Sequence, residues 1–258
     1  MGRHVIDILG LNAGYFLGYD GRKQKYVRHP LRSLVGNTAA ERGNLDTFLD
    51  TIERRDPDVI GLVEVDQGSI RTRTDGQVAH LQSRLRERGL EYDADAAFKY
   101  RDISILERVP LIASMSNGVL FRGGEVRHHH LHRGWKRLLT EIVTDRVSIF
   151  LCHLPYPLFG QTRQRQLEEM AEILADRERY VVFGDFNIQE PGELDVVRER
   201  AGASVHTPGP TYPVRSPHHR YDVFLTGPGT TLQECGTLDI EISDHLAVHG
   251  RVSVDQER

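Results

Sequence analysis

The pattern that decides the fold lies in residues 180–191, which read YVVFGDFNIQEP. The apolar and aromatic run at its start predicts a buried strand, and the strand ends in Asp185 and Asn187. In an extended chain, residues two apart point to the same side, so Phe186 would enter the core while the carboxylate and the amide converge. Such a pair can hold a water molecule, a metal ion or a phosphate oxygen. The proline and glycine that follow also favour the simpler interpretation of a turn.

The composition is that of an ordinary globular chain. Its 258 residues suffice for one large domain or two small ones, 39% of them are hydrophobic, and the net charge is −4. We find no run of about 18 apolar residues and no long apolar segment at the N-terminus, so we expect neither a membrane span nor a secretory signal. The two cysteines, Cys152 and Cys235, cannot build a disulfide framework. We therefore expect a cytoplasmic monomer, and the acidic balance argues against binding DNA through overall charge.

Strand and helix patterns alternate from one end of the chain to the other. Helical spacing of apolar residues predicts helices over residues 44–54, 80–88 and 163–176. Strands are expected at 5–9, 58–63, 117–121, 138–143, 147–152, 180–183, 221–225 and 246–252. Residues 144–146 predict a hairpin turn, which joins antiparallel neighbours. The chain is therefore expected to form one α/β domain over residues 1–258, with a sheet that is mixed rather than purely parallel.

Polar side chains recur at the ends or starts of these expected strands. Asp222 begins an apolar run, where an unpaired carboxylate would be costly to bury. Carboxylate and amide oxygens suit a hard divalent cation, whereas imidazoles suit proton transfer or anion binding. Each position is a weak signal alone, but together they predict a site that combines a cation with two imidazoles. The positions besides Asp185 and Asn187 are Asn12, Glu64, His153, Asp222, Asp244 and His245.

Seven short motifs, taken in chain order, resemble the signature of the endonuclease/exonuclease/phosphatase family. They are Leu11-Asn12, GLVEV at 61–65, NGVL at 117–120, CHL at 152–154, GDFN at 184–187, YDVF at 221–224 and SDH at 243–245. The resemblance spans residues 11–245. It implies a four-layer α/β sandwich, in which two mixed β-sheets pack face to face with helices outside and the active site lies at one edge.

The resemblance also implies that the chain hydrolyses a phosphoester with Mg²⁺, for which Mn²⁺ can substitute. Glu64 would be the principal metal ligand, with Asn12 and Asp244 nearby. Asp185 would orient or activate the attacking water, and Asn187 would help to hold that water and a phosphate oxygen.

The two imidazoles receive roles by the same resemblance. His245, oriented by Asp222, would contact the phosphate, and His153 would stabilise the transition state or assist the leaving group. Charge develops on phosphate oxygens during such a reaction, and a cation and imidazoles placed there lower the barrier. Candidate substrate contacts are Asn117, Lys136 and Arg137. The two basic residues flank a strand, where solvated charges are also common.

Several further residues have both a functional and a structural interpretation. Tyr100 and Asp102 could enter the site or belong to a plain loop, and Thr211 and Tyr212 match a loop that supports the site in relatives.

The histidines at 128–130, 132 and 218–219 invite a zinc site, but no cysteine lies near and consecutive residues cannot all face one metal, so a flexible polar loop is favoured. Cys152 is expected to face the core, opposite its neighbour in the strand, which argues against a thiol enzyme.

Three classes of function remain: a nucleic-acid phosphodiesterase, a phosphatase or phosphodiesterase acting on a small molecule or lipid headgroup, and an inactive binding module on the same fold. The third is disfavoured because every matched position carries a competent residue. The first two share their chemistry, and loops decide the substrate. Basic residues near the site favour nucleic acid, with Trp135 available to stack on a base, unless these charges are dispersed and solvated. They are Arg71, Arg73, Lys136, Arg137, Arg215 and Arg220.

Overall fold

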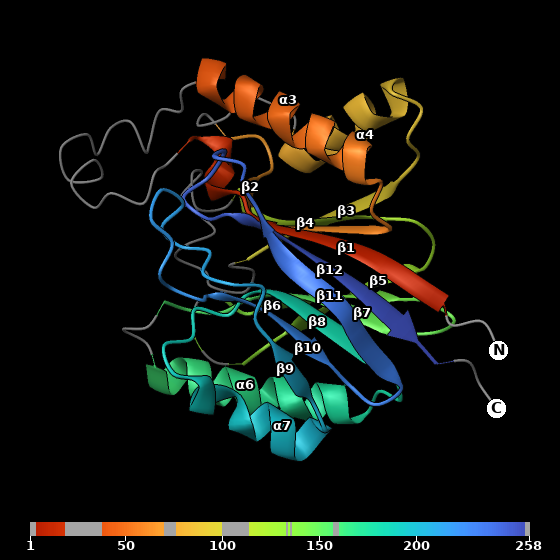
Figure 1. The fold of residues 1–258 in the computed structure, drawn as a ribbon, viewed down its shortest axis with the longest axis vertical. Helices are drawn as coiled ribbons and strands as arrows, with labels where there is room; N and C mark the ends of the chain where they lie inside the picture. The colour runs from red at the N-terminus through yellow and green to blue at the C-terminus, as the bar shows by residue number, and fades with distance from the viewer. Residues whose placement is uncertain are drawn as a thin grey trace.

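The computed structural model describes residues 4–18, 38–69, 76–99, 114–132, 134, 136–156 and 160–255. In these ranges two six-stranded sheets lie face to face between two layers of helices (Figure 1). Helices α3 (Thr38–Arg55) and α4 (Gln77–Glu87) cover the first sheet, whereas α6 (Gly160–Ala175) and α7 (Asp195–Ala201) cover the second. This is the four-layer α/β sandwich that the sequence predicted. A single domain over residues 1–258 stays a prediction.

The first sheet has the strand order β11-β12-β1-β2-β4-β3. Within it β1 and β2 run parallel, and the other neighbouring pairs are antiparallel. The sheet is therefore mixed, as expected. Its strands are β1 (His4–Asn12), β2 (Val59–Asp66), β3 (Asp93–Phe98), β4 (Met115–Phe121), β11 (Thr230–Leu238) and β12 (Ala247–Val254).

The second sheet has the strand order β5-β6-β7-β8-β10-β9, with β7 and β8 parallel and the other pairs antiparallel. The hairpin predicted at residues 144–146 joins β6 to β7. The strands are β5 (Glu125–His130), β6 (Leu138–Val143), β7 (Ser148–His153), β8 (Tyr180–Asp185), β9 (Ser204–His206) and β10 (Asp222–Thr226). Two short 3₁₀ helices, η1 (Gly14–Phe16) and η4 (Pro191–Leu194), follow β1 and β8.

Apolar side chains fill the space between the sheets, and one glycine sets how closely the sheets approach. Phe183 of β8 and Phe224 of β10 stack with ring centroids 6.1 Å apart in this layer. Gly61 of β2 faces them, and a Cβ at this position would lie 2.4 Å from ring carbons of Phe183. A larger residue would force the sheets apart, because protein cores are packed without spare volume.

The strand at residues 125–130 corrects one expectation. A flexible polar loop at His128–His130 is wrong, because these residues form β5 at the edge of the second sheet. Consecutive side chains there have separate acidic partners: His128 Nε2 lies 2.8 Å from Asp95 Oδ1, and His129 Nε2 lies 2.7 Å from Glu141 Oε2. Pairing with β6 and these side-chain contacts hold a strand that its polar sequence did not reveal, at a sheet edge where polar residues are common.

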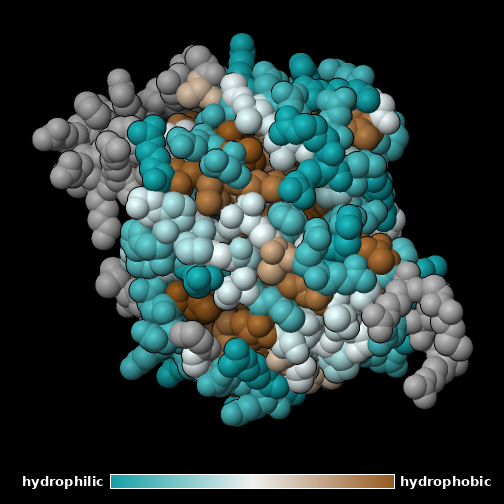
Figure 2. All heavy atoms as spheres, in the orientation of Figure 1, coloured by the Kyte–Doolittle hydropathy of each residue, from teal (hydrophilic) through white to brown (hydrophobic). Residues whose placement is uncertain are grey.

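Cys152 lies in the core, and the face of the molecule shown in Figure 2 is mainly polar. Cys152 is 1% exposed and packs in the core between the second sheet and its helices, as predicted. No helix in the described ranges is long and apolar enough to cross a bilayer. Figure 2 shows one face of the molecule on which polar residues predominate and apolar residues gather only in small patches.

Candidate active site

Three strand ends of the second sheet lie in register. His153 at the end of β7 is opposite Asp185 at the end of β8, which is opposite Asp222 at the start of β10. Gly184 precedes Asp185 with a φ of +131°, and a Cβ there would lie 2.2 Å from the carbonyl oxygen of Cys152. Only glycine tolerates both this conformation and this approach. The glycine of the GDFN motif thus allows the Asp185 carboxylate to lie beside His153.

The first sheet supplies a second row of polar residues. Asn12 at the end of β1 is opposite Val63 of β2, which is opposite Asn117 of β4. The register of β2 shifts between Val63 and Val65, so Glu64 occupies a bulge, with a φ of +58°. This left-handed conformation costs about 1–2 kcal/mol, and bulges commonly re-aim a side chain next to an active site. The bulge explains how Glu64 becomes partly exposed in a strand whose other residues are buried.

The two rows meet across the sandwich, at the opposite end of β1 from His4, which pairs with Val254 of β12 (Figure 1). Asn12 Nδ2 donates a hydrogen bond of 2.9 Å to Asp185 Oδ2. His153 Nε2 lies 3.5 Å from Asp185 Oδ2 and 3.7 Å from Glu64 Oε1. The structure therefore brings together the asparagine, the two carboxylates and the imidazole that the sequence placed at four separate strand ends.

Asn187 reaches the site by a turn, which corrects the expected geometry. β8 ends at Asp185, and Asn187 adopts a φ of +51° rather than an extended conformation. Its backbone N–H donates to Asp185 Oδ1 at 3.0 Å, and its Nδ2 donates to the carbonyl oxygen of Leu154 at 3.1 Å. Asparagine tolerates this conformation better than most residues. Phe186, between them, is buried in the core as predicted.

His245 and Asp222 form a buried pair next to Asp185. His245 Nδ1 lies 2.9 Å from Asp222 Oδ2, and its Nε2 lies 3.9 Å from Asp185 Oδ2. Burial alone would lower the pKa of His245, but the negative charges of Asp222, Asp185 and Asp244 raise it to about 10. His245 is therefore an imidazolium at neutral pH, with Nε2 directed toward the site. The Asp244 carboxylate accepts a hydrogen bond of 3.2 Å from Ser243 Oγ, and its role as a metal ligand stays a prediction.

Asp185 and His153 differ from His245 in charge: at neutral pH the first is negatively charged and the second is neutral. Burial, reinforced by Asp222, raises the pKa of Asp185 to about 6, although His245, Lys136 and Asn12 act in the opposite direction. Asp185 is thus ionised at neutral pH but basic enough to accept a proton. Burial, and then the positive charge of Lys136, holds the pKa of His153 well below its usual range, so this imidazole is neutral. Its Nε2 contacts Lys136 Nζ, and its buried Nδ1 has no hydrogen-bond partner in the described residues.

Two lysines approach the Glu64 carboxylate. Lys136 Nζ lies 3.6 Å and Lys99 Nζ 3.8 Å from the same oxygen, Oε1. Burial would raise the pKa of Glu64, but Lys99, Lys136 and His245 together lower it, so the carboxylate stays ionised. Lys136 was a candidate from the sequence, whereas Lys99 was not. Lys99 follows β3, whose alanine-rich sequence DADAAF gave no strand signal.

The donor set fits a hard divalent cation. Glu64, Asp185 and Asn12 present carboxylate and amide oxygens, and Asn117 Oδ1 is buried without a hydrogen-bond partner among the described residues. Within those residues, no group of three or more His, Cys, Asp and Glu side chains is arranged to hold a metal ion. Mg²⁺ does not require such a cage, since it commonly keeps several waters and uses one or two carboxylates.

Tyr212 was predicted to lie in a loop that supports the site, but the aromatic group that it forms next to His245 was not predicted. The ring centroid of Tyr212 lies 5.0 Å from that of His245 and 5.5 Å from that of Tyr221. His219 stacks on Tyr221 at 4.9 Å. The backbone of Thr211 bonds to that of His219, so the loop predicted to support the site does lie against this group. Its only sequence signal was the recurrence of tyrosine and histidine over residues 212–221.

The proposed basic groove receives little support from the described residues. Arg137 Nε contacts the carbonyl oxygen of Gly134, and the exposed Arg215 pairs with Glu241 at 3.6 Å. The predicted contributions of Arg71, Arg73, Tyr100, Asp102 and Trp135 lie outside the described residues. Among the described residues of the predicted basic group, Lys136 is the one for which a contact with Glu64 is found.

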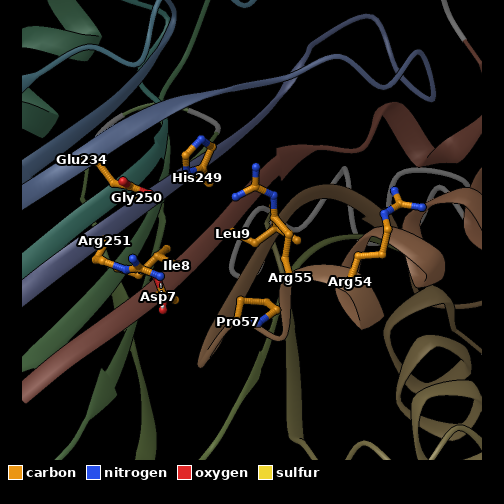
Figure 3. Close-up of a pocket in the computed structure, with 10 residues that line it drawn as sticks. All are labelled: Asp7, Ile8, Leu9, Arg54, Arg55, Pro57, Glu234, His249, Gly250 and Arg251. Carbon is orange, nitrogen blue, oxygen red and sulfur yellow. Dashed lines mark hydrogen bonds and ion pairs between the residues drawn. The ribbon is translucent and has the colours of Figure 1, made fainter.

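A cavity of about 420 Å³ lies elsewhere, on the outer face of the first sheet (Figure 3). The end of α3 forms one wall through Arg54 and Arg55, and β12 forms another through His249 and Arg251. Arg251 is held by an ion pair with Asp7, with Nε 2.8 Å from Oδ1. None of the candidate catalytic residues lines this cavity.

A family model described as Endonuclease/Exonuclease/phosphatase family matches residues 31–245. The chain therefore belongs to this family of phosphoester hydrolases, which includes nucleases and phosphatases and is generally dependent on divalent metal ions. No curated protein matches the sequence at a significant level.

Solved structures are similar over nearly the whole chain. An endonuclease/exonuclease/phosphatase from Beutenbergia cavernae DSM 12333 is 17% identical with a TM-score of 0.69, and the match covers 98% of this chain and 72% of that one. D. rerio TDP2, complexed with single strand DNA product, is 15% identical with a TM-score of 0.61, covering 96% and 98%. The Bacteroides thetaiotaomicron VPI-5482 mannosyl-6-phosphatase Bt3783 is 13% identical with a TM-score of 0.64, covering 96% and 99%. At these identities the likeness establishes the fold alone.

Proposed function

We propose that this chain is a Mg²⁺-dependent phosphoester hydrolase in which water, activated by Asp185, attacks the phosphorus in line with the leaving oxygen. The observation that carries the proposal is the position of the Asp185 carboxylate. It is hydrogen-bonded to Asn12 and lies within 4 Å of both His153 Nε2 and His245 Nε2. A buried carboxylate whose pKa is raised toward neutrality is a suitable general base.

The two imidazoles have different proposed roles, one at a phosphate oxygen and the other at the leaving oxygen. His245, protonated and fixed at Nδ1 by Asp222, donates from Nε2 to a phosphate oxygen as negative charge develops there. Neutral His153 contacts the Lys136 ammonium, and this pair supplies positive charge and a proton to the leaving oxygen. Asp185 takes the proton that the attacking water loses. The water oxygen forms the new bond to phosphorus, and the ester oxygen leaves.

Glu64 and Asn12 are the proposed metal ligands, together with Asp244. When bound, Mg²⁺ polarises a phosphate oxygen and lowers the pKa of a coordinated water.

Glu64→Gln is expected to raise the Mg²⁺ concentration needed for half-maximal activity by about tenfold or more, because a charged oxygen ligand is lost. Steady-state turnover is measured as Mg²⁺ is added back to chelator-treated protein. Glu87→Gln, a surface change on α4, is the control and should leave the titration unchanged. An unaltered Mg²⁺ requirement in Glu64→Gln would remove Glu64 from the metal site.

For the substrate, we propose a phosphodiester in nucleic acid over a small phosphate ester. The partly exposed rings of Tyr212 and His219, which pack on the buried Tyr221 beside His245, support this choice, since base stacking on aromatic rings is a common mode of single-strand binding. Lys136 supplies a cation at the same place. A small-molecule phosphatase is the alternative, and it requires only one phosphate pocket.

Salt dependence distinguishes these substrates. The inactive variant Asp185→Ala should bind a single-stranded oligonucleotide with an affinity that falls steeply with salt, by about 0.7 log units per log unit of salt for each neutralised phosphate. Turnover by the wild type is measured in parallel on oligonucleotides, plasmid, inositol phosphates and bis(p-nitrophenyl) phosphate. Turnover of small esters alone, without oligonucleotide binding at low salt, would favour the phosphatase. Turnover of none of them would contradict the proposed function.

A further inference from the structure

We propose that Gln77 is a positioning residue of this site, which holds the candidate metal ligands Asn12 and Glu64 at a fixed separation. The inference rests on the proposed function and deepens it. Gln77 is the first residue of α4, lies outside the sequence motifs and is completely buried. No step described above uses it. It acts through the backbone of the two segments that follow these ligands in the chain.

The side-chain amide of Gln77 joins three parts of the chain. Its Nε2 donates hydrogen bonds to the carbonyl oxygen of Tyr15 and to Glu41 Oε1, both at 2.8 Å. Its Oε1 accepts a hydrogen bond of 3.0 Å from the backbone N–H of Asp66. Both amide hydrogens and the amide oxygen are therefore engaged, and an apolar side chain of the same size could make none of these bonds.

The bond to the Tyr15 carbonyl holds a strained turn next to Asn12. Gly14, Tyr15 and Phe16 have φ values of +47°, +58° and +56°, a left-handed conformation that is unfavourable for the two aromatic residues. Such a turn persists only where its surroundings fix it. Within it the N–H of Gly14 donates to Asn12 Oδ1 at 3.2 Å. The turn therefore orients the same amide whose Nδ2 bonds to Asp185.

The bond from the Asp66 N–H holds the segment after the Glu64 bulge. Glu64 is itself in the left-handed region, and β2 resumes its pairing with β4 at Val65 and Asp66. On the other side of the bulge, the carbonyl oxygen of Val63 accepts the N–H of Ala13 at 2.8 Å. The bulge is thus held from β1 on one side and from α4 on the other, and the Gln77 amide supplies the second of these supports.

One amide group therefore ties the turn after Asn12 to the strand end after Glu64. Without it both ligands remain, but the two segments can move independently and must be ordered when a metal ion binds. Residues that orient metal ligands from outside the coordination sphere contribute about 10- to 100-fold to metal affinity. Gln77 should consequently affect the binding of Mg²⁺, although it does not itself offer an atom to the ion.

The test is calorimetric titration of Gln77→Met with Mg²⁺, which we expect to bind about 10- to 100-fold more weakly than to the wild type. Glu64→Gln, titrated alongside, identifies the heat that belongs to this site. Turnover of Gln77→Met should rise toward the wild-type kcat as Mg²⁺ is increased, because every ligand is still present. Should Gln77→Met fold poorly, Gln77→Asn is titrated in its place, since its shorter amide cannot span the same partners.

Gln82→Met is the matched control. Gln82 lies on the same helix, and its Nε2 also donates to a tyrosine carbonyl oxygen, that of Tyr92, at 2.8 Å. This bond joins α4 to the segment before β3, which carries none of the candidate metal ligands. Gln82→Met should therefore lower the melting temperature but leave the Mg²⁺ affinity unchanged.

Wild-type Mg²⁺ affinity in a folded Gln77 variant would overturn the inference, and so would an equal loss of affinity in Gln82→Met. The titrations involve no turnover, so they can be separated from the proposed function. A chain that binds Mg²⁺ as expected in every variant but hydrolyses no ester would contradict only that function.

Discussion

Asp185→Asn should lower kcat by roughly 10³- to 10⁴-fold, because it removes the group that takes the proton from the attacking water. The change is nearly isosteric, and the amide oxygen can still accept one of the two hydrogen bonds that Asn12 and the Asn187 N–H donate to the Asp185 carboxylate. The loss should therefore appear mainly in kcat, while the melting temperature falls by no more than the loss of one buried hydrogen bond explains. Steady-state kinetics on bis(p-nitrophenyl) phosphate and thermal unfolding give both quantities. Near wild-type turnover would exclude Asp185 as the base.

The pH dependence gives an independent check of this role. Burial raises the pKa of Asp185 to about 6, and only the ionised form can accept the proton. Activity of the wild type should thus fall as the pH drops through this value. His245 has its pKa raised to about 10, so it keeps its proton through neutral pH and loses it only well above. The residual activity of Asp185→Asn should lack the acidic limb.

His245→Ala should lower kcat by about 10²- to 10⁴-fold, the range for a positioned electrostatic or acid–base group. Without it, no imidazolium faces the developing charge beside Asp185. Asp222→Asn should cost less, since it weakens the orientation and charge of His245 but leaves the ring in place.

Replacing His128, His129 and His130 together by alanine is the control for this prediction. These residues form β5, which β6 and β7 separate from β8, and His128 and His129 contact carboxylates on other strands. Activity should remain nearly intact. Full turnover in a correctly folded His245→Ala protein would show that the SDH motif has been assigned the wrong role.

The central strands and helices α3, α4 and α6 could be predicted because each carries its own apolar pattern, whereas the short helix α7 was not predicted. β8, for example, is a continuous buried run that ends at a glycine. The strands that were missed, β3, β5, β9 and β11, lie at or near sheet edges and contain many polar or small residues. Their conformation is decided by the neighbour with which they pair, which is information that a local pattern does not contain.

Within the site, too, local sequence patterns indicated some features, whereas strand pairing decided the others. Motifs placed Asn12, Asp185 and His245 at strand ends, and the register of the sheets brings these ends together. The bulge at Glu64 and the approach of Lys99 depend on how β2, β4 and β3 pair, so no local signal indicated them. The turn at Asn187 was available from the sequence as the alternative to an extended chain.

The hydrogen bond from Asn12 to Asp185 joins a residue of one sheet to a residue of the other, so the alignment of the candidate catalytic groups depends on the spacing between the sheets. That spacing is set in part where Gly61 meets the ring of Phe183, in the core. Core residues that touch none of the candidate site residues thus help to set the geometry of that site. A larger side chain at Gly61 is expected to change the distance between Asn12 and Asp185 while every candidate site residue stays the same.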